Sequence, residues 1–310
     1  MRKHILPLLC LSFVCFSCSS SPSSSEAKIA SSPEEVSSEA PSLGEIPYDI
    51  LKDEEIVSGL TANDARFDVS KVEKVEGHPL EGKKIFWLGS SVTYGASSEG
   101  ESMADFLAAK TGAICVKEAI SGTTIYDNGG LGNSGDKSYT RRLYNGKILD
   151  PDEKIDAFIC QISTNDARNE ALSHRGSITP DDVLDFEDFD RSTTLGGVEF
   201  IISYATETWN CPVYFYSGSY FGDGSGTRKN SNPKGSEYGK LVNEVKQIVE
   251  KWNKVSYADV HVIDLFNDEE FNAKVSDKYY TWATSDPVHP KKAGYLQWWT
   301  PYFEYYLLNN

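Results

Sequence analysis

The stretch FWLGSSVTYG, residues 86–95, carries an apolar run directly into Gly-Ser-Ser and a small polar turn. The apolar run, which begins at Ile85, predicts a buried strand over 84–88 that ends at the turn. A serine in this position is either an ordinary turn residue or a nucleophile. The stretch alone does not decide between the two, so the rest of the chain has to.

Beyond this stretch, short apolar runs alternate with helical patterns. The run at 156–162 is the most clearly buried strand, and apolar residues recur at helical spacing over 236–252. This alternation predicts a parallel sheet with helices on both faces. The predicted strands are 84–88, 113–116, 156–162, 213–216 and 260–265, and the predicted helices are 101–110, 198–209, 236–252 and 292–308.

Polar residues follow several of these strands, and parallel sheets bind ligands beyond the carboxyl ends of their strands. Ser91 follows the first strand, Gly122 the second and Asn165 the third, while Asp286 and His289 lie beyond the fifth. Ester hydrolysis needs such parts. A serine hydroxyl needs a base to accept its proton, a histidine can do so near neutral pH, and a carboxylate fixes the tautomer of that histidine. Preset donors then stabilise the oxyanion.

The order Gly-x-Ser, Gly, Asn-Asp and Asp-x-x-His resembles the SGNH or GDSL hydrolase superfamily, from roughly residue 83 to the end. The resemblance implies that Ser91 is the nucleophile, His289 the base and Asp286 the acid of a catalytic triad. It also implies an oxyanion hole formed by the backbone N–H groups of Ser91 and Gly122 and by the side chain of Asn165. The implied fold is a flavodoxin-like three-layer αβα sandwich with a central parallel sheet, in agreement with the alternation of elements.

Two positions depart from the family pattern. Ser90 stands where the family has an aspartate before the nucleophile, and we expect this to affect the rigidity of the loop more than its chemistry. Ser163 stands where the third block usually begins with glycine, so we expect a side chain to affect how closely the backbone can be approached at this position.

Two competing motifs fail on context. The run GLGNSG, residues 130–135, has the letters of a dinucleotide fingerprint, but it follows no strand directly and opens no helix. The acidic run at 181–190 lacks the order and the glycine of an EF-hand, which favours a solvated loop. We therefore expect neither a cofactor nor a metal.

The N-terminal region has the features of an export signal. A basic start and a short apolar run lead to Cys18, which resembles the lipid-accepting cysteine of a bacterial lipoprotein. We expect residues 1–17 to be a signal peptide and 18–44 a Ser, Pro and Glu-rich disordered tether. Residues 45–82 form a lead-in that the sequence does not assign, and 83–310 form the hydrolase domain. The expected location is the cell surface or the periplasmic face, with an ordinary cleaved signal and free secretion as the alternative.

The charge balance limits the partners. Thirty Lys and Arg stand against 46 Asp and Glu, a formal net charge of −16. Such a body repels nucleic acid and anionic lipid surfaces, so we expect no nucleic-acid partner and membrane contact only through the lipid anchor. Of the six cysteines, Cys115, Cys160 and Cys211 fall in or beside apolar runs and are expected to be buried thiols.

The expected substrate is an ester on a glycan or a lipid. Polar loops at 163–194 and 217–236 offer no continuous apolar slot for a long acyl chain. Trp282 and Tyr280, near His289, are candidates for stacking on a sugar, and His174 is a candidate substrate contact. We expect hydrolysis of short O-acyl groups, such as acetyl groups on a glycan, through an acyl-enzyme. The alternatives are a lysophospholipase or lipase and a non-catalytic glycan-binding lipoprotein.

Overall fold

The computed structural model of this protein describes residues 59–127, 129, 137–145, 149–219 and 236–310. The expected signal peptide with Cys18, the expected tether, residues 45–58, the GLGNSG run and most of the polar loop at 217–236 lie outside these residues.

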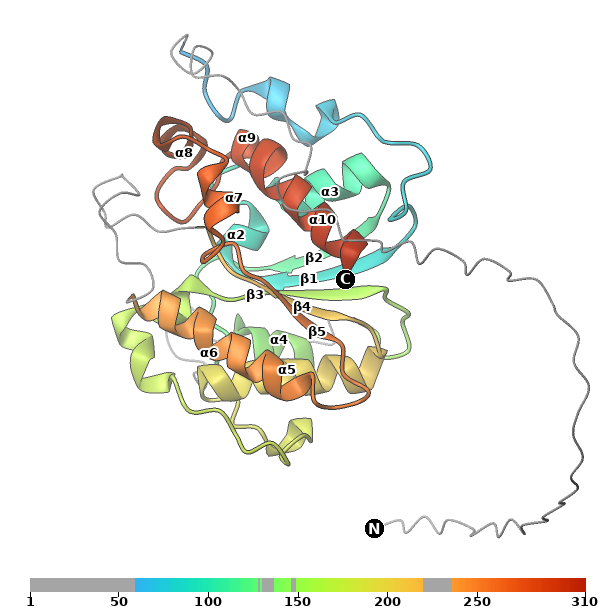
Figure 1. The fold of residues 1–310 in the computed structure, drawn as a ribbon, viewed down its shortest axis with the longest axis vertical. Coiled ribbons are helices and arrows are strands. Elements are labelled where there is room, and N and C mark those ends of the chain that lie inside the picture. Colours follow the sequence, from blue (N-terminus) through green and yellow to red (C-terminus); the bar gives the residue numbers. More distant parts are fainter. Residues whose placement is uncertain (1–58, 128, 130–136, 146–148, 220–235) are drawn as a thin grey trace, which may run out of the picture. The chain divides into compact units, whose positions relative to one another are not determined.

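A sheet of five parallel strands lies at the centre of the described chain, in the order β2-β1-β3-β4-β5 (Figure 1). This is the flavodoxin-like order, in which ligands bind where the chain changes direction between β1 and β3. The predicted α/β fold with a central parallel sheet is therefore confirmed. The strands are β1 Lys84–Gly89, β2 Ile114–Ala119, β3 Ala157–Gln161, β4 Val213–Tyr216 and β5 Val260–Ile263.

Both faces of the sheet are covered by helices. In β1, Ile85 and Trp87 face the core that contains α3 and α10, while Phe86 and Leu88 face the core that contains α5 and α6. Figure 1 shows these two layers on opposite sides of the strands. Because a strand covered on both faces can be apolar at every position, β1 reads as a continuous run rather than as an alternation.

The helices fall into long and short elements. None of the described helices is long and apolar enough to cross a membrane. The α-helices are α2 Ser91–Tyr94, α3 Met103–Thr111, α4 Tyr139–Asn145, α5 Thr194–Trp209, α6 Glu237–Trp252, α7 Glu269–Ala273, α8 Asp277–Ala283, α9 Lys292–Gly294 and α10 Thr300–Asn309. The 3-10 helices are η2 Ala65–Phe67, η3 Val69–Lys71, η5 Thr164–Ala167, η6 Asn169–His174 and η7 Phe186–Asp188, and η10 Tyr295–Trp299 is a π-helix.

Several elements differ from their predicted extents, and three of the differences have a structural reason. β2 continues to Ala119 because Lys117 and Glu118, which read as polar in the sequence, are paired with charged side chains of neighbouring elements. α5 begins four residues before the predicted start, because the Thr193 side chain caps it by accepting the N–H of Gly196. Gly196 reads as a helix breaker, but a methyl group there would lie 2.3 Å from a backbone oxygen, so only glycine fits. The predicted closing helix is interrupted by the π-helical turn η10.

The described part of the lead-in, residues 59–82, packs against the C-terminal helices. Phe67 forms a small apolar cluster with Ala62 and Ala293. The backbone N–H of Ala293 donates to the carbonyl of Ala62 at 2.9 Å, and the indole N–H of Trp282 donates to the carbonyl of Leu60 at 2.7 Å. This segment is therefore part of the packed body next to the loop that carries His289.

A buried ion pair between α5 and α6 provides a test of the core. Lys251 donates to the carboxylate of Glu199 at 2.6 Å, and the two side chains are 4% and 0% exposed. Lys251→Met would leave the Glu199 charge buried, and we expect the free energy of unfolding to fall by about 3–5 kcal/mol. Urea denaturation measures this change.

The matched control is Lys254→Met. The Lys254–Asp181 pair is 66% and 68% exposed. Solvent screens this pair, so we expect a change of less than about 1 kcal/mol. Equal effects of the two substitutions would contradict the assignment of the Lys251 pair as a core element.

Candidate active site

The turn after β1 positions Ser91. Gly89 ends the strand, and a methyl group there would lie 1.7 Å from Oγ1 of Thr93, so only glycine allows this turn. Gln161, at the end of β3, accepts hydrogen bonds from the Ser90 N–H at 2.9 Å and from the Thr93 hydroxyl at 2.8 Å. Ser91 therefore stands at the carboxyl edge of the sheet, 8% exposed and at the first position of α2.

The structure brings His289 and Asp286 to this serine. Nε2 of His289 lies 2.8 Å from Oγ of Ser91, although 198 positions separate the two residues in the chain. Nδ1 of the same imidazole lies 2.9 Å from Oδ2 and 3.0 Å from Oδ1 of Asp286. The three side chains thus form one continuous hydrogen-bonded chain from carboxylate to hydroxyl.

The loop itself fixes the carboxylate of Asp286. Its Oδ1 accepts the backbone N–H groups of Val288 and His289, both at 2.8 Å. Partial burial raises the pKa of Asp286, but the hydrogen bonds from the His289 side chain and from these two N–H groups outweigh it and lower the pKa below its ordinary value. Asp286 is therefore an ionised acceptor at neutral pH, suited to orient the imidazole and to stabilise its protonated form.

Gly122 and Asn165 lie in two loops that are joined through Thr123. Gly122 has a φ of +80°, a conformation that favours glycine. The side-chain amide of Asn165 donates to the carbonyl of Thr123 at 2.9 Å, and the hydroxyl of Ser163 donates to the same oxygen at 3.1 Å. The Ser163 hydroxyl thus takes part in joining the two loops, at the position where the family pattern has glycine.

Three buried polar residues that position this site were missed by the sequence analysis. Gln161 reads as part of an apolar strand. The feature that could have indicated its role is a polar side chain near the end of a predicted strand. Arg142, 6% exposed, donates from Nη2 to the Gly89 carbonyl at 2.8 Å and from Nη1 to Glu118 at 2.9 Å, which joins the ends of β1 and β2. Its position within a polar run gave no signal. Asp166 is the second residue of the Asn-Asp pair, and the sequence indicated no role for it.

Asp166 holds the loop that follows Gly122. Its carboxylate accepts the N–H of Ile125 at 3.0 Å and the hydroxyl of Thr194 at 3.0 Å, in a fully buried position. Burial is the largest influence and raises the pKa of Asp166 to about 6, although hydrogen bonds from Ile125 and Thr194 oppose it. The carboxylate couples the Gly122 loop to α5.

The three expected substrate contacts have other positions. Tyr280 is 3% exposed and its hydroxyl donates to the Pro287 carbonyl at 2.8 Å, so the expectation that it stacks on a sugar is wrong. Trp282 is partly buried against Phe67 with its N–H bound to Leu60, which makes it a packing residue. The packing of Trp282 depends on Leu60 and Phe67, which are distant in the sequence.

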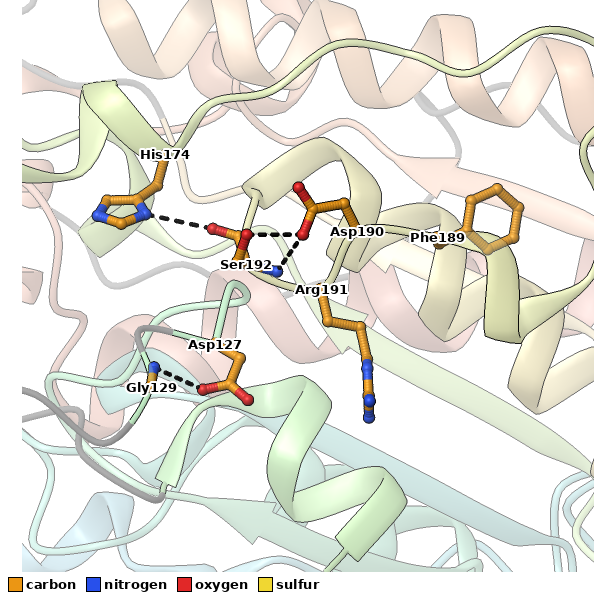
Figure 2. A pocket seen from close by; sticks show the side chains of 7 residues that line it. All are labelled: Asp127, Gly129, His174, Phe189, Asp190, Arg191 and Ser192. Carbon is orange, nitrogen blue, oxygen red and sulfur yellow. Dashed lines mark hydrogen bonds between the residues drawn. The ribbon is translucent and has the colours of Figure 1, made fainter.

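His174 lines a hollow of about 550 Å³ (Figure 2). This hollow shares no lining residue with the cleft beside His289. Its ring stacks on Tyr126 with centroids 4.4 Å apart, and Nδ1 lies 3.2 Å from the Ser192 carbonyl. The lining residues of this hollow are Asp127, Gly129, His174, Phe189, Asp190, Arg191 and Ser192.

A second cleft, of about 340 Å³, lies directly beside His289. Its wall combines apolar groups with charged and hydroxyl groups, as is usual for sites that bind small polar ligands. Within the described residues, no group of three or more His, Cys, Asp or Glu is placed to hold a metal ion. The cleft is lined by Thr164, Ala167, Arg168, Ser236, Glu237, Tyr238, Val288 and His289.

Comparison with known proteins supports the fold. No protein-family model matches the sequence, and no curated protein matches it either. A solved structure of a protein from Lactobacillus plantarum is similar, with a TM-score of 0.52 and 19% identity, over 73% of this chain and 97% of that chain. A second solved structure has the same TM-score and identity over 74% of this chain and 99% of its own. A carbohydrate acetylesterase family member from Sinorhizobium meliloti is 13% identical over 73% of this chain and 97% of its own, with a TM-score of 0.42.

The first two likenesses show that this chain shares the fold of those proteins. It is the α/β fold that the resemblance to the SGNH or GDSL hydrolase superfamily implies, with Ser91 beyond β1 and Asn165 beyond β3 at the ligand-binding edge.

The titration of Asp166 gives a test of its position. Because its folded pKa of about 6 lies above the ordinary 3.8, the folded state holds this proton more tightly than the unfolded chain does. The group therefore lowers stability as pH rises from about 4 to 6, and the cost is complete above pH 6. Asp166→Asn has no titrating group at this position, so its stability does not fall in this way. We therefore expect the difference in free energy of unfolding, native chain minus variant, to decrease between pH 4 and pH 7 by on the order of 2–3 kcal/mol.

Urea denaturation of both proteins at several pH values measures this advantage. Asp181→Asn, at an exposed carboxylate, is the control and should show no such trend. An advantage over Asp166→Asn that grows with pH would contradict the raised pKa of Asp166.

Proposed function

We propose that this protein is a serine ester hydrolase of the SGNH or GDSL type. The observation that carries the proposal is the contact of His289 Nε2 with Ser91 Oγ at 2.8 Å, together with the contact of His289 Nδ1 with Asp286 at 2.9 Å. Nucleophile, base and orienting acid within hydrogen-bond reach are the geometric requirements for acyl transfer from an ester.

In the proposed reaction, Oγ of Ser91 attacks the ester carbonyl carbon while His289 accepts the hydroxyl proton. The tetrahedral intermediate collapses, the C–O bond to the alcohol breaks, and His289 gives its proton to the leaving oxygen. Water, deprotonated by His289, then cleaves the acyl-enzyme and regenerates Ser91. Asp286 stabilises the imidazolium formed in each half of the cycle.

The oxyanion of both intermediates requires donors at the same place. The resemblance assigns the backbone N–H groups of Ser91 and Gly122 and the side-chain amide of Asn165. An amide nitrogen carries two hydrogens, so Asn165 can donate to Thr123 and still supply a second hydrogen. Loss of one such donor typically costs about 3 kcal/mol of barrier stabilisation.

We propose short O-acyl groups, such as acetyl groups on a glycan, as the substrate class. The cleft beside His289, about 340 Å³, is near the lower end of the roughly 300–1,000 Å³ usual for ligand sites, which favours a compact group over a long acyl chain. Attachment to a membrane through a lipid on Cys18, and a location outside the cytoplasm, remain part of this proposal.

Ser91→Ala tests the nucleophile. We expect kcat/KM for acetyl esters to fall by about 10⁴–10⁶-fold, because the acyl-enzyme cannot form. A fluorophosphonate probe should label the native chain at Ser91 and not the variant. Ser256→Ala, at an exposed serine, is the control and should be labelled like the native chain. Absence of labelling of the native chain would favour a non-catalytic glycan-binding protein.

An acyl-length series of nitrophenyl esters tests the substrate class. We expect the acetyl ester to give the highest kcat/KM and the octanoyl ester a value about tenfold or more lower, because a cleft of about 340 Å³ has little room for a longer acyl chain. Acetate release from acetylated polysaccharide measures the same activity on a glycan. A maximum at long chains would instead identify a lipase or lysophospholipase.

A further inference from the structure

The cleft beside His289 contains a cation that no group in the described part of the chain neutralises. Arg168 lines this cleft and is exposed. Among the described residues, its side chain has no hydrogen-bond or ion-pair partner. A guanidinium has five N–H donors in a planar fork that fits carboxylate and phosphate oxygens.

The backbone places this side chain near the reacting groups. Arg168 directly follows η5, the short helix that carries Asn165, and its N–H donates to the Asn165 carbonyl at 3.3 Å. His289, on the C-terminal loop, lines the same cleft. A ligand in this cleft therefore meets both the proposed base and the guanidinium.

The carboxylate in the same cleft is already neutralised by other groups. Glu237 accepts from Lys240 at 2.6 Å and lies 3.5 Å from Arg175. The hydrogen bond from Lys240 lowers the pKa of Glu237, so this group stays ionised and paired. Glu237 therefore does not cancel the positive charge of Arg168.

The two acidic residues that lie two positions from Arg168 along the chain act elsewhere. Asp166 is buried and accepts hydrogen bonds from Ile125 and Thr194. The charge of Glu170, after burial and Asp166, contributes to raising the pKa of the Tyr126 hydroxyl, which places Glu170 near Tyr126. The chain as a whole has a net charge of −16 and repels anions. A cation that no described side chain pairs gives an anionic substrate a favourable local position within a repelling surface.

We propose that Arg168 selects substrates whose sugar carries an oxyanion, either a carboxylate or a phosphate, in addition to the acylated hydroxyl. The proposal rests on the esterase function proposed above and names its substrate class more narrowly. Because an acetyl group has no ionisable atom, the negative charge belongs to the alcohol half of the ester, which is the glycan.

A matched set of three acetylated sugars tests this selection. The set is methyl 3-O-acetyl-glucoside, the corresponding glucuronoside and the corresponding glucoside 6-phosphate, with acetate release as the readout. For the native chain we expect kcat/KM to be about tenfold to a hundredfold higher for one or both anionic sugars than for the neutral one. The preferred sugar identifies the source of the oxyanion, and 0.5 M salt should reduce the preference.

The ratio of anionic to neutral kcat/KM is the quantity to follow in the variants. Arg168→Ala should bring it to about one, and Arg168→Glu should bring it below one. Arg168→Lys should keep more of the preference for phosphate than for carboxylate, because an ammonium group lacks the planar fork. Arg66→Ala, at an exposed arginine paired with Asp64, is the control and should leave the ratio unchanged.

Two results overturn this proposal alone: equal rates of the native chain on neutral and anionic sugars, or a preference for anionic sugars that persists in Arg168→Ala. Both require that Ser91 reacts with the fluorophosphonate probe and that acetate is released. If the native chain neither reacts with the probe nor releases acetate from any of the three sugars, the proposed esterase function fails, and this proposal fails with it.

Discussion

The hydrogen bonds accepted by the side chain of Gln161 are the constraint on which the site depends. Its Oε1 lies at the end of β3, 1% exposed, and accepts from the backbone N–H and hydroxyl of Ser90 and of Thr93. Buried donors of this kind cost about 1–3 kcal/mol each when they lose their acceptor. The contact therefore fixes the turn after β1 to the end of β3, the two strands between which the ligand-binding edge forms.

The remaining loops are held by separate means. The Asp166 carboxylate, which binds the Gly122 loop through Ile125, also accepts the hydroxyl of Thr194 in α5. The Asn165 side chain joins the same loop to η5 through the Thr123 carbonyl. The His289 loop is held by residues of other segments that pair with Lys292. Lys292, three residues after His289, is buried and pairs with Asp68 at 2.6 Å and with Glu99 at 2.5 Å. Residues 59–82, which the sequence left unassigned, therefore help to set the position of the imidazole.

The sequence predicted those parts that have a local or ordered signal. The strands were visible because parallel strands covered on both faces are apolar at every position, and the Ser91, Asp286 and His289 set was visible through the order of its blocks. Gln161, Arg142 and Asp166 were not, because a single polar side chain in or beside a strand has no periodicity. The packing of the aromatic residues near His289 was not visible in the sequence for a related reason.

Their burial depends on packing across distant parts of the chain. Trp282 contacts Phe67 and Leu60, more than two hundred positions away, and no spacing rule reports such a contact. The extent of β2 was underestimated on similar grounds, since Lys117 and Glu118 find charged partners on α3 and α4. Tertiary partners therefore decided each of these positions against the local pattern.

Two kinds of cation in the described part of this acidic chain differ in a way that bears on function. Arg142, Lys251 and Lys292 are 4–6% exposed, and each has a carboxylate partner, as the cost of burying a charge requires. They can bind nothing else without breaking that pair. Arg168 is exposed, so solvent can reach its donors. It can therefore exchange water for a ligand oxyanion without loss of an internal contact, which is the property required of a cation that selects a substrate.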